Sequence, residues 1–292
     1  MLRLRHILHP LRFAESVYRR VSQAAYSFLA KRRFRNIRRG QRDCCWCGGE
    51  LLPFRWHPSY GVCARCGSYV NRIPPTPEGL NQLYSLNSYW VLRQKAQGFP
   101  PIATRAALYL ADGRVEFWLK LIERYAPDKS HAIEVGCAPG ILLARLRERR
   151  LTCLGVEPSE ETAAWVREKY RIDVRTGLFP EIDLPSCDLF LAFDVLEHSH
   201  DPLLFMRKAS DLLTPGGVAI IQTAIDRYDY VPPFGDRFDG FDELEHLFLF
   251  TDRAMSELAA RSHLDVVSLE ERLWLLGEVA VFRKPVTPLL GG

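Results

Sequence analysis

The chain has 292 residues, of which 47% are hydrophobic and 25% charged, as is typical of a soluble globular protein with one full α/β domain and a smaller module. No run of about eighteen apolar residues occurs, so the sequence predicts no membrane-spanning helix. Four of the eight cysteines are clustered as two pairs rather than spread as a disulfide framework, which predicts a reducing, cytoplasmic location.

Residues 1–40 form a strongly basic arm, with eleven Lys or Arg residues and a single acid, Glu15. Because the whole chain carries +4, this arm at +10 leaves the other residues with a net charge of −6. From Pro10 onward the arm is predicted to be an amphipathic helix whose apolar residues share one face. These residues are Leu11, Ala14, Tyr18, Val21, Ala25 and Phe28.

This pattern leaves several roles open for the arm. It is typical of a helix that lies on an anionic membrane, here the inner membrane surface, and also of an RNA-binding arm or a transit peptide. A solubilising tail, or a helix packed on its own domain, is the simpler interpretation.

Residues 41–73 carry two Cys-x-x-Cys-Gly knuckles separated by fifteen residues. This spacing turns four thiolates onto one metal ion and predicts a zinc ribbon. The predicted ligands are Cys44, Cys47, Cys63 and Cys66. Cys45 is a spare thiol that competes with Cys44. Because four protein sulfurs leave no open coordination position, we interpret the zinc as structural, contributing on the order of 10 kcal/mol to folding.

Residues 74–110 are a proline-marked linker with short helical pieces, and residues 111–292 are the predicted main domain. Two tyrosines of the linker, Tyr84 and Tyr89, are candidates for closing over a ligand of that domain. A helix-rich run over residues 105–125 leads into the first strand.

The main domain begins with an apolar run that breaks into glycine and is followed at once by a helix. This segment runs from His131 to Gly140, and Gly136 and Gly140 let a ligand approach the backbone closely. Such strand-turn-helix units bind nucleotide-like ligands at the carboxyl end of a parallel strand. About twenty residues further on, a second apolar run ends in Glu157, placed to accept hydrogen bonds from the two hydroxyls of a ribose.

A buried central strand is predicted over residues 187–193, because this run is apolar without alternation. It delivers Asp194, Glu197 and His198 to the same edge of the sheet. A neutral imidazole held by a carboxylate is a suitable base for a weakly acidic hydroxyl. His198 with Glu197 is therefore the first candidate for that role, and a purely structural role in the loop is the alternative.

Residues 224–250 are predicted to be an insertion that overhangs the ligand pocket, or else a mobile acidic loop. Five of its aromatic residues are suited to stacking on sugar rings: Tyr228, Tyr230, Phe234, Phe238 and Phe241. Its net charge of −5 would repel the phosphate backbone of a nucleic acid. His246 is a second polar candidate for the acceptor pocket, and two last strands are expected near residues 264–269 and 276–283.

The chain resembles class I S-adenosylmethionine-dependent methyltransferases over residues 130–284, in the order and spacing of four motifs. These are Glu134-x-Gly136-x-x-x-Gly140, Glu157, Asp194-Val-Leu-Glu-His198 and Leu213-Thr-Pro-Gly-Gly217. The resemblance implies an α/β fold with a Rossmann-like seven-stranded sheet, and S-adenosyl-L-methionine as cofactor. The implied cofactor-binding residues are Glu134, Gly136, Cys137, Ala138, Gly140, Glu157, Leu178 and Asp194. Many relatives carry an acid near position 178, so adenine recognition in this chain is expected to use the backbone.

With the zinc ribbon and linker included, residues 44–284 resemble a bacterial group of enzymes of surface polysaccharide, lipid-linked sugar and deoxysugar biosynthesis. The resemblance implies methyl transfer to a sugar or to a glycolipid or polysaccharide precursor. Sugar C-methyltransferases of that group carry a large extra C-terminal domain, whereas this chain ends at Gly292, which favours O-methylation. The expected catalytic residues are His198, Glu197 and His246.

Two alternatives are an RNA methyltransferase that uses the basic arm and zinc ribbon, and an O-methyltransferase acting on a quinone-type small molecule. The acidic insertion and the lack of an Asn/Asp-Pro-Pro-Tyr motif argue against RNA. A small-molecule or glycan substrate is therefore the expected partner.

Overall fold

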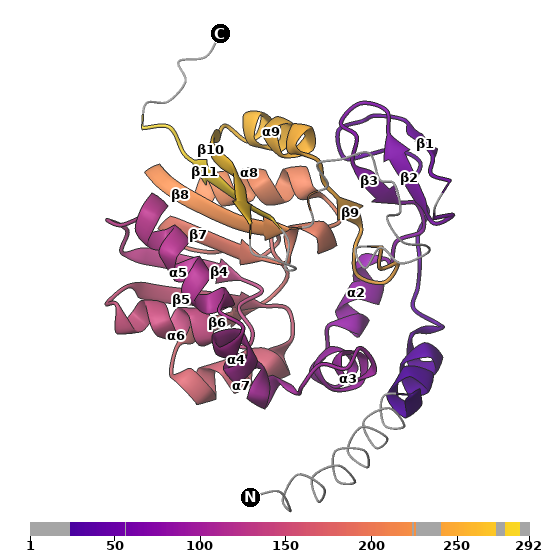
Figure 1. Ribbon diagram of the computed structural model, residues 1–292, viewed down its shortest axis with the longest axis horizontal. Helices are drawn as coiled ribbons and strands as arrows, with labels where there is room; N and C mark the ends of the chain where they lie inside the picture. Colours follow the sequence, from indigo (N-terminus) through magenta and orange to yellow (C-terminus); the bar gives the residue numbers. More distant parts are fainter. Residues whose placement is uncertain (1–23, 56, 224, 226–240, 273–277, 287–292) are drawn as a thin grey trace, which may run out of the picture.

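The computed structural model describes residues 24–55, 57–223, 225, 241–272 and 278–286, arranged as Figure 1 shows. A seven-stranded sheet forms the centre, with strand order β10-β11-β8-β7-β4-β5-β6. Strands β4 to β8 run parallel, and β10 and β11 add an antiparallel pair beside β8. The strands are β4 (His131–Val135), β5 (Thr152–Glu157), β6 (Asp173–Thr176), β7 (Cys187–Phe193), β8 (Leu213–Thr223), β10 (Asp265–Arg272) and β11 (Glu278–Arg283). The predicted Rossmann-like, seven-stranded sheet is confirmed.

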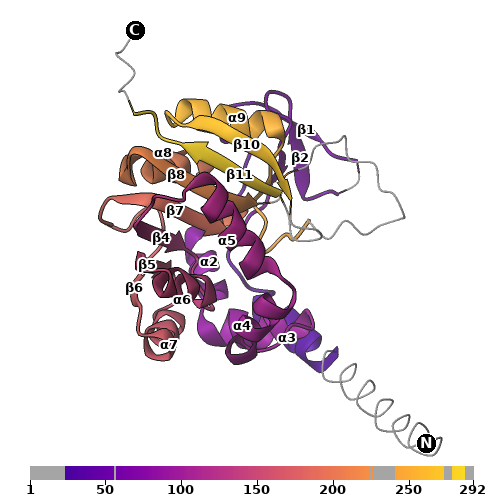
Figure 2. The same cartoon turned by 60° about the vertical axis from the view of Figure 1, so that its left-hand side comes forward.

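Helices cover both faces of the sheet because β7 is apolar on both faces, with Leu189, Phe190, Leu191 and Ala192 fully buried. Three helices, α5 to α7, pack on one face, while α8 and α9 pack on the other (Figure 2). Their bounds are α5 (Arg114–Tyr125), α6 (Ile141–Glu148), α7 (Glu160–Tyr170), α8 (Pro202–Leu212) and α9 (Asp252–Arg261).

The helix-rich run predicted over residues 105–125 consists of two helices, α4 (Ile102–Ala111) and α5. The break lies at Gly113, whose φ of 80° is in the left-handed region. Glycine adopts this conformation without steric cost, so the chain turns there and α5 starts in a new direction.

The cysteine-rich segment forms a second, smaller sheet from β1 (Leu51–Pro53), β2 (Tyr60–Cys63) and β3 (Tyr69–Asn71). Its fourth strand is β9 (Phe248–Leu249), which comes from the far end of the chain and pairs antiparallel with β3. The cysteine-rich segment therefore packs with the main domain as one body. The predicted boundary at residue 73 marks the end of a sequence segment and not of a separately packed unit.

The linker folds into α2 (Pro77–Leu83), the π-helix η1 (Leu86–Arg93) and the short helix α3 (Gln94–Ala96). The Thr76 side chain caps α2 by accepting a hydrogen bond from the Gly79 N–H at 3.2 Å, and Pro77 stands at the first helical position.

Of the predicted basic arm, the structure describes residues 24–40, and residues 1–23 lie outside the described residues. Residues 24–34 are helical. Ala30, Phe34 and Ile37 are buried in the same apolar cluster as Leu80 and Leu83 of α2. Within the described part of the chain, none of the helices is long and apolar enough to cross a bilayer.

Candidate active site

The turn between β4 and α6 has the backbone that its sequence predicts. Gly136 and Gly140 have φ values of +69° and +83°, in the region where a Cβ is disfavoured. A Cβ on Gly136 would lie 2.6 Å from a methyl group of Val195, and one on Gly140 would lie 2.6 Å from a methyl group of Val166. Both positions therefore require glycine for packing as well as for backbone shape.

A pocket of about 300 Å³ lies at the carboxyl ends of β4, β5 and β7. Its walls come from the β4–α6 turn, from the ends of β5 and β7, and from the linker helices α2 and η1. It joins Gly136 and Glu157 on one side to His198 on the other. Ligands of doubly wound folds bind at this edge of the sheet.

Five of the predicted cofactor residues line this pocket: Gly136, Ala138, Glu157, Leu178 and Asp194. Glu134 and Cys137 line a smaller cavity beside it, which also reaches Asp194. Gly140 lines neither cavity, because it is the N-cap of α6 and packs against α7.

Sequence reasoning placed Tyr84 and Tyr89 at the pocket but missed most of its other apolar wall. The missed lining includes Trp90, Tyr109, Phe179, Pro180 and Phe205. These residues come from α4, η1, α8 and the loop after β6. The Phe179–Pro180 pair in the loop after β6 was the one feature of the sequence that could have indicated this wall. A pair that only packs in the core has the same sequence pattern.

Buried acids surround the turn. Burial raises the pKa of Glu157 to about 8, although the backbone N–H groups of Ala138 and Ser159 favour its charged form. Glu134 is also buried, its Oε2 has no hydrogen-bond partner, and burial together with the nearby Glu157 raises its pKa well above the usual value. A ligand that brings hydrogen-bond donors and positive charge suits this environment.

His198 stands at the other end of the pocket, in a short 3-10 turn (η2, Leu196–His198) that directly follows β7. Its Nδ1 lies 2.6 Å from the carbonyl oxygen of Glu245. Since a carbonyl only accepts, Nδ1 carries the hydrogen and Nε2 carries the lone pair of the neutral ring. Burial lowers the pKa of His198 to about 4, so the ring is neutral at pH 7.

The predicted orientation of His198 by Glu197 is wrong. The Glu197 carboxylate is buried and accepts a hydrogen bond from the Thr223 hydroxyl at 2.8 Å. The nearby His246 favours its charged form. The hydrogen-bond partner of the His198 ring is instead the Glu245 carbonyl, so the ring is oriented by the backbone and not by the neighbouring carboxylate.

His246 lies close to both residues but does not line the pocket. Its ring centroid is 5.1 Å from that of His198, and one ligand atom each of Glu197, His198 and His246 lie within 4.8 Å of one another. The three predicted catalytic residues are thus together, with His198 facing the pocket and the other two behind it.

A buried ion-pair network fixes the chain that holds His198. The Arg93 guanidinium at the end of η1 donates to the carboxylates of Asp242 and Glu245. The Asp242 carboxylate also accepts from the Leu244 N–H at 3.0 Å. The same short segment then supplies the Glu245 carbonyl to His198.

Two described residues of the predicted insertion, Phe241 and Glu243, pack away from the pocket. Phe241 contacts the rings of Tyr60 and Tyr69 on the small sheet, with centroids 4.8 and 5.6 Å apart. Glu243 accepts a hydrogen bond from Ser59 at 2.6 Å and pairs with Arg39 at 3.4 Å. These two residues do not overhang the pocket, and Tyr228, Tyr230, Phe234 and Phe238 lie outside the described residues.

Comparison with known proteins agrees with this geometry. Residues 109–269, more than half of the chain, match the model of a family described as a methyltransferase domain. The chain belongs to this methyltransferase family. A probable S-adenosylmethionine-dependent methyltransferase of Mycolicibacterium smegmatis is 30% identical over 151 residues, 44% of this chain and 58% of that protein. A ubiquinone biosynthesis O-methyltransferase of Bradyrhizobium diazoefficiens is 29% identical over 97 residues, 31% of this chain and 38% of that protein.

These alignments span less than two thirds of each curated relative. Among solved structures, the methyltransferase domain is similar to a SAM-bound amino pentose methyltransferase from Micromonospora echinaspora. The TM-score is 0.50 at 18% identity, over 62% of this chain and 94% of that chain. A similarity at this identity shows the shared fold.

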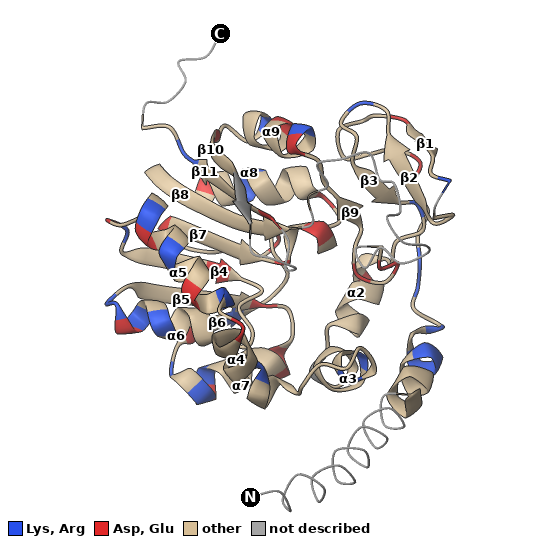
Figure 3. Ribbon diagram, viewed as in Figure 1, with Lys and Arg blue, Asp and Glu red and all other residues tan. Residues whose placement is uncertain are grey.

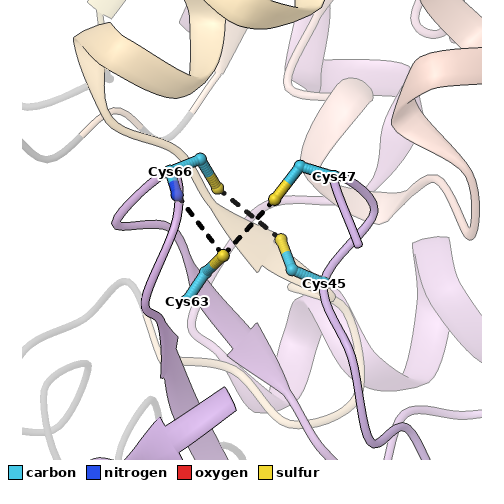
Figure 4. Close-up of side chains that lie close together, drawn as sticks. All are labelled: Cys45, Cys47, Cys63 and Cys66. Carbon is cyan, nitrogen blue, oxygen red and sulfur yellow. Dashed lines mark hydrogen bonds between the residues drawn. The ribbon is translucent and has the colours of Figure 1, made fainter. Parts of the chain in front are cut away.

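Beside the methyltransferase domain, the small sheet gathers four buried cysteines (Figure 4). These are Cys45, Cys47, Cys63 and Cys66, whose sulfur atoms all lie within 4.8 Å of one another. The Cys45 and Cys66 sulfurs are 3.6 Å apart, and those of Cys47 and Cys63 are 3.4 Å apart.

Cys44, a predicted ligand, is exposed and is not part of this cluster, so that assignment is wrong. The chain is extended there, with Cys44 bridged to Glu50, and successive side chains of an extended chain point to opposite sides. Cys45 faces inward instead, and its N–H donates to the Gly49 carbonyl at 3.0 Å to close the turn.

Proposed function

We propose that this protein is an S-adenosylmethionine-dependent methyltransferase that methylates a hydroxyl group of a sugar, glycolipid or polysaccharide precursor. The observation that carries the proposal is one continuous pocket, with the Gly136 turn and Glu157 at one end and His198 at the other. Membership of the methyltransferase family and the names of its relatives support the reaction class.

The residues present fit this cofactor. Glu157 is placed to accept hydrogen bonds from ribose hydroxyls, and the free Oε2 of Glu134 offers an acceptor near the turn. Leu178 and Phe179 offer an apolar wall for a flat base. When bound, adenosylmethionine supplies an electrophilic methyl group on a positively charged sulfonium, which buried carboxylates stabilise.

His198 then acts on the acceptor. Its Nδ1–H is held by the Glu245 carbonyl, so Nε2 is the atom that accepts the hydroxyl proton. Tyr84 stands beside it, with ring centroids 6.1 Å apart, and its hydroxyl is buried without a hydrogen-bond partner in the described residues. That hydroxyl suits the orientation of a second polar group of the acceptor.

A quinone-type phenol is the second candidate acceptor. The specific observation in its favour is the aromatic wall formed by Tyr84, Tyr89, Trp90 and Tyr109, which suits a flat ring as well as a sugar face. Transfer of a labelled methyl group to nucleotide sugars, lipid-linked glycans and quinols, tested in parallel, decides between the two. If no acceptor of these three classes is labelled, both candidates are wrong.

The Glu157→Ala variant is expected to bind adenosylmethionine at least about tenfold more weakly, equivalent to about 1.4 kcal/mol. The reason is the loss of charge-assisted hydrogen bonds to the ribose. Because the pKa of Glu157 is about 8, the wild-type affinity should also rise between pH 6 and 8 as the carboxyl loses its proton, and level off above. Isothermal titration calorimetry at several pH values measures both effects.

The matched control for this titration is Glu161→Ala, which removes an exposed carboxylate from the first turn of α7. It should leave the affinity and its pH dependence nearly unchanged. Equal affinity of the wild type and Glu157→Ala would show that the ribose is bound elsewhere.

The Arg93→Met variant is expected to lower turnover roughly tenfold while leaving cofactor affinity unchanged, because Glu245 loses the ion pair that holds its carbonyl on His198. Arg93 lowers and Asp242 raises the pKa of His198. Removing Arg93 should therefore move the acid limb of the pH–rate profile to higher pH. Arg93→Lys should bring the acid limb part of the way back to its wild-type pH. Arg145→Met, on the surface of α6, should change neither turnover nor the pH–rate profile. An unmoved pH profile in Arg93→Met would contradict the positioning role.

We also propose that the cysteine cluster holds one structural zinc ion. Four buried, disulfide-free sulfurs at this spacing are the donor set that zinc prefers, and a Cβ on Gly49 would lie 2.5 Å from the Cys63 sulfur, so the cluster is tightly enclosed.

A further inference from the structure

The helix over residues 24–34 has an inner and an outer face. On its inner face, Ala30 and Phe34 are buried in the apolar core, the Tyr26 hydroxyl accepts a hydrogen bond from Lys95 at 3.2 Å, and Ser27 donates to the Ala96 carbonyl. These contacts anchor the helix on the linker helices. Its outer face therefore keeps a fixed direction relative to the domain.

The outer face exposes large apolar side chains. Phe28 is 66% exposed and its neighbour Leu29 is 49% exposed. Ala25 and Phe28 are the last two residues of the apolar stripe that the sequence predicts from Leu11 onward, and both are exposed. The described end of this stripe thus faces away from the protein, and the buried residues Ala30 and Phe34 belong to a different face.

The same helix ends in three basic residues, Lys31, Arg32 and Arg33, and Arg35 follows in the next turn, so that the four form an exposed basic cluster. None of the four forms an ion pair with a carboxylate of the described residues. No Asp or Glu occurs in residues 24–42, and Figure 3 shows basic residues along this helix without an acidic one.

We propose that the outer face of residues 24–35 docks on an anionic lipid bilayer. Phe28 and Leu29 enter the boundary between headgroups and acyl chains, and the basic cluster contacts the lipid phosphates. Charge alone would fit nucleic acid equally well, but two adjacent large apolar side chains gain little from a phosphate backbone. The combination of exposed apolar and basic groups matches a membrane surface.

Docking at this face would bring the pocket close to the bilayer. Tyr26 and Ser27 contact α3 directly, and η1, which immediately precedes α3, lines the pocket with Tyr89 and Trp90. This step rests on the proposed methyl transfer. If that function holds, the acceptor is an amphiphile presented by the membrane, and the polar group of the amphiphile reaches His198.

Sedimentation of the full-length protein with vesicles tests the docking. Binding is expected to phosphatidylcholine vesicles that contain phosphatidylglycerol, and to be at least about tenfold weaker to phosphatidylcholine alone. The Phe28→Ser/Leu29→Ser and Lys31→Gln/Arg32→Gln double variants should each lose at least about tenfold in affinity. Val266→Ser/Val267→Ser, which removes two exposed apolar neighbours on β10, is the matched control and should bind as the wild type does.

Cofactor affinity, measured on each variant, checks that the fold and the pocket are intact independently of vesicle binding. The proposal is overturned if the wild type does not bind anionic vesicles, or if both double variants bind them normally. It is also overturned if a single-stranded RNA displaces the protein from vesicles with a steep salt dependence. Vesicle binding by a protein that transfers no methyl group would refute the proposed function and leave the docking intact.

Discussion

Replacing Cys45 by serine is expected to release the proposed zinc ion and to destabilise the fold, whereas Cys44→Ser should retain both the metal and the stability of the wild type. The reason is that the Cys45 sulfur lies within the buried four-sulfur cluster, while Cys44 is exposed. Structural zinc contributes on the order of 10 kcal/mol in small metal-dependent folds, so loss of one ligand is a large effect. Elemental analysis and thermal unfolding of the two variants measure it.

The destabilisation should also reach the pocket. The Arg42 guanidinium, just before the cluster, donates to the His200 carbonyl at 3.1 Å, and His200 lines the pocket. The small sheet also shares β9 with the chain that follows His246. We therefore expect weaker cofactor binding in Cys45→Ser and unchanged binding in Cys44→Ser. Zinc lost from Cys44→Ser but retained in Cys45→Ser would reverse the assignment, and wild-type protein without zinc would refute the metal site.

The His198→Ala variant is expected to lower turnover by roughly 10²–10⁴ while cofactor affinity stays nearly unchanged. The imidazole accepts the hydroxyl proton at Nε2 and has no part in holding the nucleotide end of the pocket. In the wild type, the rate should fall as the pH drops through about 4, because the base must be neutral and burial lowers its pKa to that value. Below this pH the protonated ring has no lone pair left for the acceptor.

The pH of this acid limb distinguishes a buried His198 from an exposed histidine, whose pKa would be about 6–7. Steady-state rates between pH 3.5 and 8, with cofactor saturating, locate the limb. His246→Ala is the control, because its ring lies 5.1 Å from that of His198 but outside the pocket. If His246→Ala abolishes turnover and His198→Ala retains it, the base is His246. If both retain it, the acceptor loses its proton without a histidine.

The sequence by itself determined the features that depend on short segments. The Gly136 turn, the acid at the end of β5 and the apolar run of β7 each reflect a local demand: a positive φ, a polar group at a strand end, or burial on both faces. Such demands constrain residue type within a few positions of one another. The seven-stranded sheet and the polar end of the pocket, with Gly136, Glu157 and Asp194, could therefore be predicted, whereas most of the apolar wall of the pocket could not.

Only the tertiary structure decided which of several chemically suitable groups contact each other. Cys44 and Cys45 are chemically equal, and the direction of one extended segment selects Cys45. His198 has an acid as its neighbour in sequence, yet its partner is the Glu245 carbonyl, 47 residues away. A backbone carbonyl carries no mark in the sequence, because every residue has one. Its position depends on Arg93 and on the long-range packing that brings η1 and the segment before β9 together.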